Sequence, residues 1–463
     1  MSAEGLTAAQ EKMRAGGVHP VAVGVFSHYY RQLETGATGL LLESDLQPLT
    51  DPPRLADVDL DATSGQTALA STVVIKLNGG LGTSMGMARA KSLLEVRDGL
   101  SFLDLIASQV LRTRERHGVR LPLVFMNSFR TRDDTLQALQ AYPDLSVGEL
   151  PLDFVQNREP KIRADDLTPV EWPTDPGLEW CPPGHGDLYT ALSASGLLTQ
   201  LIAAGYRYAF VSNADNLAAT VDVRVAGWFA STGAPFASEV CRRTAADRKG
   251  GHLAVRKSDG QLVLRESAQT APQDASSFAD ITVHRYFNTN NLWLDLQALA
   301  DTLAASGGVL GLPLIRNVKT VDPAESASPE VIQIETAMGA AVEVFPGALA
   351  LEVDRARFLP VKSTNDLLAL RSDVYEVSDD FAVSLARGLA DAPLVDLDPE
   401  FYRLVGDFDA RFASGAPSLV GASSFTVRGD WRFGADVGAR GDVQVGAEGS
   451  AGTVAAGTVL EGD

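Results

Sequence analysis

Apolar side chains near the start of the chain recur every three or four positions, the spacing of one helix face. Ala22, Phe26, Tyr29, Tyr30 and Leu33 follow this pattern, so we expect a helix there that buries them. The stretch 46–61 is rich in proline and aspartate, which is typical of a loop. Residues 1–70 are therefore predicted to form an N-terminal segment of helix and loop.

From residue 72 onward, short apolar runs alternate with patterns of helical spacing. Four of the runs are predicted strands, at 73–77, 121–127, 152–155 and 208–213. Three segments are predicted to contain helices, at 92–118, 131–142 and 187–205. Alternation of strands with helices favours a parallel, doubly wound α/β sheet. We place this domain at 71–345 and expect residues 346–420 to form a linker with helices.

The tail, 421–463, has a different pattern. RGDWRFG at 428–434 is echoed twelve residues later by RGDVQVG at 440–446, and Val427 and Phe433 are six apart, as are Val437 and Val443. Twelve residues are two hexapeptides, which favours a parallel β-helix with the RGD triplets in its turns. A few ordinary β-hairpins are the alternative.

Composition narrows the function. The chain has 463 residues, enough for two or three domains. Its net charge of −20 disfavours general nucleic-acid binding, so an anionic ligand must be met by locally placed cations. Cys181 and Cys241 lie far apart, which favours a reducing compartment over a disulfide or a zinc site. The N-terminus lacks the layout of a signal peptide and no long apolar run occurs, so we expect a cytoplasmic protein without a membrane span.

A glycine-rich loop follows the first predicted strand, in VVIKLNGGLGTSMGMARAKS at 73–92. Such a loop lets backbone N–H groups converge on an anion. It is not a P-loop, because Ala90 stands where the second glycine belongs. It also misses the dinucleotide fingerprint, because Gly80, Gly82 and Gly86 are misspaced and the second predicted strand ends in Met126-Asn127-Ser128 without an acid.

Several stretches resemble, in order, blocks of the eukaryotic-type UTP–glucose-1-phosphate uridylyltransferase family. They are KLNGGLGTSMG with a distant Lys-Ser, MNSF followed by TRDDT, FVQ, PPGHGD, SNADNLAATVD, RKGGHL, FNTNNLW, VIQIETAMGAA and RARFLPVKSTNDLLALRSDVY. The resemblance spans roughly residues 70–380 and is weaker in the tail. It implies a Rossmann-like (GT-A-like) nucleotidyltransferase domain with a mixed sheet and a C-terminal left-handed parallel β-helix.

The same resemblance implies a reaction. UTP and glucose 1-phosphate would give UDP-glucose and pyrophosphate with the help of Mg²⁺. Because a sugar-phosphate oxygen attacks the α-phosphorus of UTP, two polyanions must approach each other. Catalysis then consists mainly of positioning and charge neutralisation, by direct in-line displacement without a covalent nucleophile.

Roles in nucleotide binding are implied for residues that match the family's motifs. Lys91 and Lys362 are the expected catalytic, phosphate-contacting cations, and Asp215 is the expected metal ligand, because Mg²⁺ prefers carboxylate and phosphate oxygens. Gln156 would read the uracil edge, since its amide is both donor and acceptor. The remaining expected nucleotide-binding residues are Leu77, Asn78, Gly79, Gly80, Gly184 and Asn213.

The sugar phosphate is expected to contact a second set, with His185 on the phosphate: Gly79, Gly80, His185, Asn213, Gly251, Asn288 and Asn290. Asparagine suits a hexose because it offers both a donor and an acceptor to vicinal hydroxyls. One departure from the family is Arg89-Ala90, where Gly-Pro is common; Arg89 either adds a phosphate contact or points to solvent. Arg355 and Arg357 are given a lesser role, or lie on the surface of a strand.

Three other functions compete. A sister family makes UDP-N-acetylhexosamines, but it typically has alanine in place of Asn78 and lacks the arrangement around His185. A nicotinamide-dependent oxidoreductase is disfavoured by the misspaced glycines and the missing acid. A non-enzymatic scaffold is disfavoured by the intact set of Lys91, His185, Asp215 and Lys362. We expect UTP and glucose 1-phosphate as partners, no nucleic acid or membrane, and a monomer or small homo-oligomer.

Overall fold

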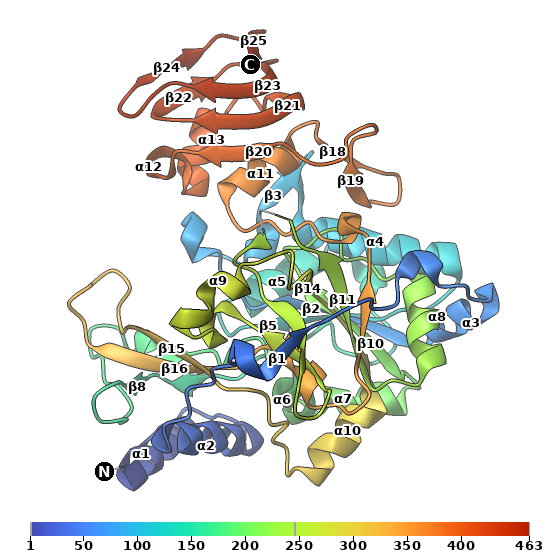
Figure 1. The fold of residues 1–463 in the computed structure, drawn as a ribbon, viewed down its shortest axis with the longest axis vertical. Coiled ribbons are helices and arrows are strands. Elements are labelled where there is room, and N and C mark those ends of the chain that lie inside the picture. Colours follow the sequence, from blue (N-terminus) through green and yellow to red (C-terminus); the bar gives the residue numbers. More distant parts are fainter. Residues whose placement is uncertain (1, 245–246, 463) are drawn as a thin grey trace.

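The computed structural model describes residues 2–244 and 247–462, and it has three parts along its long axis (Figure 1). The N-terminal helices α1 (Ser2–Ala15) and α2 (Pro20–Glu34) lie at one end, the α/β domain in the middle and a stack of short strands at the other end. No helix in the described ranges is long and apolar enough to cross a bilayer.

A ten-stranded sheet forms the middle part. Its main path runs β1-β12-β14-β10-β2-β5-β6, with β13 on β12, β11 on β14 and β17 on β11. The strands are β1 (Leu46–Pro48), β2 (Thr72–Asn78), β5 (Leu123–Asn127), β6 (Asp153–Val155), β10 (Tyr208–Asn213), β11 (Phe236–Arg242), β12 (His252–Arg256), β13 (Leu262–Arg265), β14 (Tyr286–Asp295) and β17 (Leu349–Glu352).

The sheet is mixed. Four adjacent strands are parallel to one another: β10 pairs with β2, β2 with β5, and β5 with β6. β14 runs antiparallel to both β10 and β11. The wholly parallel sheet expected from the strand–helix alternation is therefore wrong, whereas the mixed sheet implied by the family resemblance is confirmed.

The four predicted strands are β2, β5, β6 and β10, and the predicted helices are also present. α4 (Phe102–His117) begins at a capping box of Ser101 and Asp104 and ends at Gly118. α5 (Arg132–Leu139) matches the second segment. The third segment forms two helices, α6 (Asp187–Ala194) and α7 (Leu197–Ala203), because Gly196 between them has a φ of 76°.

Helices cover both faces of the sheet. Side chains of β2 alternate between two hydrophobic cores, with Val74 in one core and Val73 and Ile75 in the other. The first core includes residues of α4, α3 (Ala62–Ala70) and α8 (Val223–Thr232). The second includes residues of α6, α7 and α10 (Leu296–Ala305). β2 is thus covered by helices on both faces, which leaves its carboxyl end as the place for a ligand.

The predicted N-terminal helix is α2, and Ala22, Phe26, Tyr29, Tyr30 and Leu33 are all buried. Part of the predicted loop at 46–61 is instead strand β1, because Leu46 packs on Ala254 and Val263 of the sheet. β1 and β17 add residues on both sides of the expected 71–345 range to the sheet.

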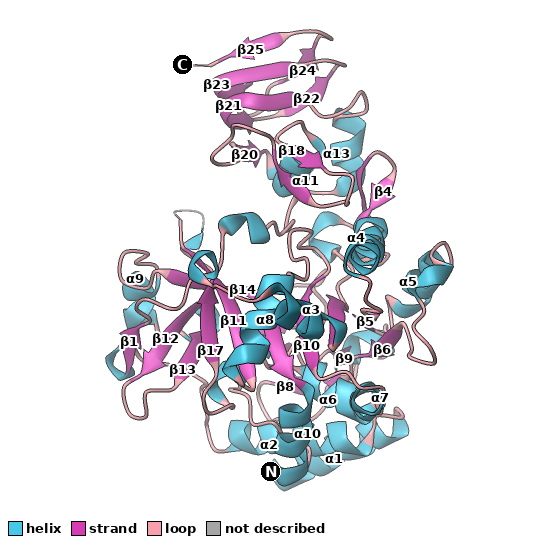
Figure 2. Ribbon diagram, turned by 90° about the vertical axis from the view of Figure 1, so that its right-hand side faces the viewer, coloured by secondary structure: helices cyan, strands magenta, loops and turns pink. Residues whose placement is uncertain are grey.

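The C-terminal strands pair in parallel. β20 (Leu394–Leu397), β21 (Ser418–Val427), β23 (Gly438–Val445) and β25 (Val459–Glu461) form one sheet, and β22 (Asp430–Phe433) pairs with β24 (Ala451–Val454). Figure 2 shows these strands stacked at the end opposite the N-terminal helices. Val427, Phe433, Val437 and Val443 are all buried, as the spacing predicts.

The twelve-residue repeat is not the structural repeat. Phe425 lies opposite Val443, eighteen residues on, and Asp430 lies opposite Ala451, twenty-one residues on. Arg428 and Gly429 lie between β21 and β22, but Asp430 is the first residue of β22 and the whole second RGD triplet lies within β23. The prediction that the triplets occupy turns is therefore wrong for the second triplet and for Asp430 of the first, because the true period spans about three hexapeptides.

Shorter elements complete the described chain. They are β3 (Glu95–Arg97), β4 (Leu100–Ser101), β7 (Glu159–Pro160), β8 (Ile162–Arg163), β9 (Trp180–Cys181), α9 (Ala275–Phe278), β15 (Ile315–Thr320), β16 (Glu330–Glu335), α11 (Thr364–Arg371), β18 (Tyr375–Val377), β19 (Val383–Leu385), α12 (Pro399–Tyr402) and α13 (Val405–Arg411).

Candidate active site

A cleft of about 340 Å³ opens at the carboxyl ends of β2, β5 and β10. The strand registers align these ends, because Leu77 lies opposite both Met126 and Asn213. Ten of the expected site residues line the cleft: Leu77, Asn78, Gly79, Gly80, Lys91, Gln156, Gly184, His185, Asn213 and Asp215. Residues spread over nearly 140 positions therefore meet in one cavity, where open α/β sheets commonly bind ligands.

The glycine-rich loop leaves β2 and returns to its own start. The Lys91 N–H donates to the Gly80 carbonyl at 3.1 Å, which closes the loop. Gly82 and Gly86 have φ values of 67° and 74°, which favour glycine. A Cβ on Gly79 would lie 2.9 Å from Oε1 of Gln156, so glycine there lets the glutamine approach the loop. Lys91 lies well after Gly80 in the sequence because the residues between them form this closed loop.

Asp215 joins the two expected phosphate-contacting lysines. Its Oδ2 accepts from Lys91 Nζ at 2.9 Å and from Lys362 Nζ at 3.0 Å. Burial alone would raise the pKa of Asp215, but the ammonium groups of Lys362 and Lys91 outweigh it and lower that pKa. Asp215 is therefore ionised at neutral pH, and two positive charges are held at the edge of the cleft.

His185 enters the cleft with a defined tautomer. Its Nδ1 accepts from the Met338 N–H at 2.9 Å, so the neutral ring carries its proton on Nε2. His185 is exposed where it lines the cleft. Loss of solvation by the protein around the ring, together with repulsion from the Lys362 ammonium, lowers the pKa of His185 to about 4. His185 is thus a neutral Nε2–H donor at physiological pH. Its neighbour Gly184 has a φ of 79°, and a Cβ there would lie 2.6 Å from the Thr336 carbonyl oxygen.

The asparagine-rich segment lies beside the cleft. Gly251, Asn288 and Asn290 are not among the residues that line it. They form a cluster of their own, in which the Asn288 N–H donates to the Gly251 carbonyl and Asn288 Nδ2 donates to Asn290 Oδ1. A Cβ on Gly339 would lie 2.6 Å from Asn288 Nδ2. Gly339 follows Met338, the partner of His185, so the cluster adjoins the cleft through these two residues.

Three arginines are placed away from the cleft lining. Arg89 is exposed and lies 3.6 Å from Asp134 on α5, so of its two predicted positions the structure favours the surface. Arg355 is paired with Asp247. Both Arg355 and Arg357 lie on a 3₁₀ turn, η11 (Arg355–Arg357), so the alternative of an alternating strand is wrong.

Some buried polar residues around the cleft were not singled out from the sequence. Lys76 on β2 donates from Nζ to Ser212 Oγ and to the Ala219 carbonyl, both at 2.7 Å. Burial lowers the pKa of Lys76 to about 7. An isolated lysine within an apolar strand offered the only sequence signal. Asn78, which was predicted, uses its side chain within the protein, because Nδ2 donates to Asn127 and Thr135.

Comparisons with known proteins show the family of this chain. Residues 24–440 match the family model described as UTP–glucose-1-phosphate uridylyltransferase. The chain belongs to the UTP–glucose-1-phosphate uridylyltransferase family. The Hordeum vulgare enzyme of this name is 40% identical over 402 residues, which cover 86% of this chain and 81% of that protein. The Saccharomyces cerevisiae enzyme is 37% identical over 422 residues, covering 90% and 83%.

Solved structures resemble this fold along nearly its whole length. A mutant of the Leishmania major UDP-glucose pyrophosphorylase in complex with UDP-glucose is 43% identical, has a TM-score of 0.92 and is matched over 99% of this chain and 98% of that one. A Trypanosoma brucei structure described as UDP-glucose phosphorylase is 42% identical, with a TM-score of 0.91 over 99% and 98%. This member of the family therefore has the mixed α/β nucleotidyltransferase sheet of those structures.

The donor set of the uridylyltransferase cleft fits a hard dication. Oδ1 of Asp215 is buried and has no hydrogen-bond partner, whereas Oδ2 is occupied by the two lysines. Within the described ranges no three His, Cys, Asp or Glu side chains gather as a metal site. A single carboxylate oxygen is nevertheless compatible with Mg²⁺, which usually keeps waters and takes phosphate oxygens as its other ligands.

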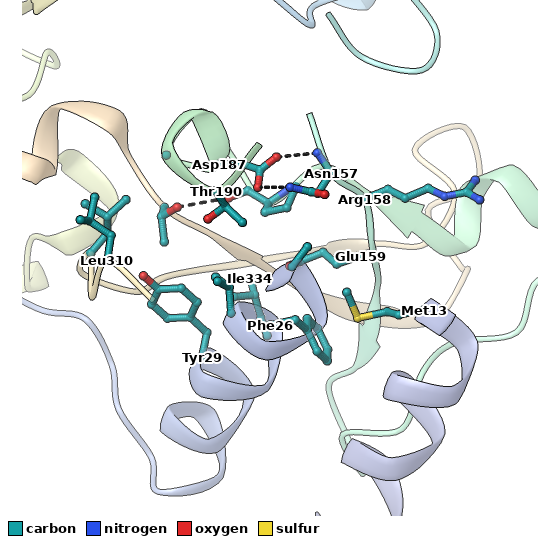
Figure 3. A pocket seen from close by; sticks show the side chains of 16 residues that line it. Met13, Phe26, Tyr29, Asn157, Arg158, Glu159, Asp187, Thr190, Leu310 and Ile334 are labelled. Carbon is teal, nitrogen blue, oxygen red and sulfur yellow. Dashed lines mark hydrogen bonds between the residues drawn. The ribbon is translucent and has the colours of Figure 1, made fainter. Parts of the chain in front are cut away.

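An enclosed cavity lies behind the loop that carries His185. It has about 20 Å³ of space and separates this loop from α2, and Figure 3 shows Phe26 and Tyr29 on its far side. At its edge the Asp187 carboxylate accepts from the Asn157 N–H at 2.5 Å and from Asn157 Nδ2 at 2.8 Å. Asp187 therefore ties the start of α6, two residues after His185, to the residue that follows Gln156.

This link should give the enzyme a measurable pH dependence of stability. Burial raises the pKa of Asp187 from 3.8 to about 7, despite the two hydrogen bonds from Asn157. Since the folded state holds this proton more tightly than the unfolded chain, stability is lost as pH rises from 3.8 toward 7. We expect Asp187→Asn to remove this loss, worth up to about 4 kcal/mol.

Urea unfolding of both proteins at several pH values between 4.5 and 8 measures the difference. The stability of the wild type relative to Asp187→Asn should fall up to about pH 7 and level off above it. Asp187→Ala removes both hydrogen bonds, whereas the single amide oxygen of Asp187→Asn keeps one, so Asp187→Ala should be the less stable variant at every pH. A constant difference between wild type and Asp187→Asn would show that Asp187 has an ordinary pKa.

Proposed function

We propose that this chain makes UDP-glucose and pyrophosphate from UTP and glucose 1-phosphate. The observation that carries the proposal is Asp215, which lines the cleft beside the closed glycine loop and binds both Lys91, also in the lining, and Lys362, which is outside it. Two cations held in one place are what the approach of two polyanions requires. The membership of the chain in the uridylyltransferase family supports the same reaction.

The reaction is a direct in-line displacement. The phosphate oxygen of the sugar phosphate attacks the α-phosphorus of UTP, and the bond to the pyrophosphate oxygen breaks. Lys91 and Lys362 stabilise the charge that develops on the phosphates, and Nε2–H of His185 donates to the sugar phosphate. Gln156 and the backbone of Leu77, Asn78, Gly79 and Gly80 hold uracil and ribose. Gly184 and Asn213 complete the nucleotide pocket.

Mg²⁺ is the proposed cofactor. Oδ1 of Asp215 would hold it, since this buried oxygen has no other partner. The ion would supply charge neutralisation on the triphosphate.

The proposed hexose site is the cluster of Gly251, Asn288 and Asn290 next to His185. Its amide groups suit vicinal hydroxyls. A UDP-N-acetylhexosamine enzyme is the second candidate, and the presence of Asn78 and His185 favours glucose.

Pyrophosphate release by the purified protein tests the proposal. With Mg²⁺ and UTP, we expect turnover with glucose 1-phosphate and little with N-acetylglucosamine 1-phosphate. Excess EDTA should abolish turnover and added Mg²⁺ should restore it. The opposite sugar preference would assign the chain to the sister activity, and turnover that survives EDTA would exclude the metal.

We also propose that the C-terminal strands are turns of a left-handed parallel β-helix. Parallel pairing in two separate sheets and the buried Val427, Phe433, Val437 and Val443 support it. A monomer or small homo-oligomer also remains our proposal, which light scattering at several concentrations would test.

A further inference from the structure

Glu239 and Arg357 form a largely buried ion pair beside the cleft. Arg357 donates from Nε to Oε2 of Glu239 at 2.9 Å and from Nη2 to Oε1 at 2.8 Å. The Glu239 side chain is 0% exposed and that of Arg357 is 11% exposed. Trp293 Nε1 and Asn291 Nδ2 donate to the same carboxylate at 3.0 and 3.1 Å. A buried pair with four such hydrogen bonds has a defined geometry.

A β-bulge brings Asn291 to this pair. Glu239 on β11 lies opposite Asn291 of β14, whereas the next residue, Val240, lies opposite Asn288. Two residues of β14 are therefore extra at this point, and one of them, Asn290, has a φ of 59°. Bulges re-aim side chains, and here the bulge directs the Asn291 amide to Glu239 and leaves Asn288 and Asn290 beside the cleft.

The segment after Arg357 is tied to the loop that carries Asp215. The Leu359 N–H donates to Asn216 Oδ1 at 2.8 Å, and the Val361 N–H donates to the Asp215 carbonyl at 3.1 Å. The Val361 carbonyl accepts from Lys91 Nζ. Residues 357–361 therefore contact Lys91 through the Val361 carbonyl, and Lys362 is the next residue along the chain.

We propose that Glu239 and Arg357 are positioning residues for the charge-neutralising pair Lys91 and Lys362. Neither lines the cleft. Their two-point ion pair anchors the start of the 357–362 segment to β11, so that the Val361 carbonyl and the Lys362 ammonium stand in place before substrates arrive. The inference rests on the proposed function, because it assigns the pair a part in phosphoryl chemistry.

Substitution of Arg357 tests the proposal. Arg357→Lys keeps the charge but loses the two-point geometry, and Arg357→Met loses both. We expect kcat to fall about 10-fold in the first and about 10²-fold in the second, with KM for UTP changed less than about 3-fold, because misplacement of catalytic groups costs turnover more than binding. The matched control is Arg242→Met, which breaks the more exposed pair of Arg242, the last residue of β11, with Glu352. It should leave kcat unchanged.

Two further measurements separate positioning from simple instability. The double variant Glu239→Gln/Arg357→Met leaves no unpaired buried charge, so it should be more stable than Arg357→Met while showing the same fall in kcat. Hydrogen exchange of a peptide that contains Leu359 and Val361 should be faster in both Arg357→Met and the double variant, but not in Arg242→Met.

The outcomes are distinct. Wild-type kcat in folded Arg357→Met, or unchanged exchange of the 359–361 amides, would overturn the positioning role. An inactive wild-type protein would overturn the proposed function instead, and the exchange comparison would still support or overturn the anchoring of the segment without any activity.

Discussion

Replacement of Asp215 by alanine is expected to lower kcat for pyrophosphate release by about 10³-fold. The change removes the carboxylate that holds Lys91 and Lys362 at 2.9 and 3.0 Å. It also removes the buried Oδ1, the proposed ligand of Mg²⁺. Both losses act on charge neutralisation of the triphosphate, so the measurement is steady-state turnover at saturating UTP, glucose 1-phosphate and Mg²⁺.

Two variants make this result specific. Asp215→Asn keeps the shape of the side chain and should lose nearly as much activity, because an amide carries no negative charge. Asp301→Ala removes an exposed carboxylate on α10 and should have wild-type turnover. If Asp215→Ala retained more than about a tenth of wild-type kcat, Asp215 would not organise the reaction centre.

Lys362→Ala should lower kcat by about 10²- to 10³-fold, because one preorganised positive charge is lost from the transition state. The Lys362 side chain is 61% exposed, whereas that of its partner Asp215 is 16% exposed. Asp215 keeps its pair with Lys91 in this variant, so the unfolding transition should stay near that of the wild type. Turnover and thermal unfolding measured on the same preparation separate the two effects.

Lys319→Ala is the matched control, since Lys319 is 51% exposed on β15, away from the cleft. It should retain full activity. Lys362→Arg should recover part of the loss, because the charge remains while its position changes. A Lys362→Ala enzyme as fast as Lys319→Ala would remove Lys362 from the reaction.

Several local features were predictable because their cause is local. Strands β2, β5, β6 and β10 follow from apolar runs, and α2 follows from the spacing of Phe26, Tyr30 and Leu33. The glycine loop was predictable as a tight turn because few residues besides glycine adopt the positive φ of positions 82 and 86. The residues that line the cleft were predicted mainly from the family resemblance.

Other features depend on contacts with residues far along the chain, and the spacing of apolar residues does not reveal such contacts. Leu46 is a strand residue only because Ala254 and Val263 pack on it. Arg357 belongs to the interior only because Glu239, 118 positions earlier, meets it. The antiparallel β14 and the true repeat of the C-terminal strands are likewise matters of pairing, since register is a property of two strands together.

The main elements of the α/β domain and the glycine loop followed from the amino-acid sequence alone, and the family resemblance supplied ten of the residues that line the cleft. The contact of Lys91 and Lys362 with one oxygen of Asp215, and the buried ion pair at the start of the segment from Arg357 to Lys362, became visible only in the folded chain. Spacing along a chain constrains neighbouring residues, whereas attraction between opposite charges more than a hundred residues apart takes effect only after the sheet has brought them together.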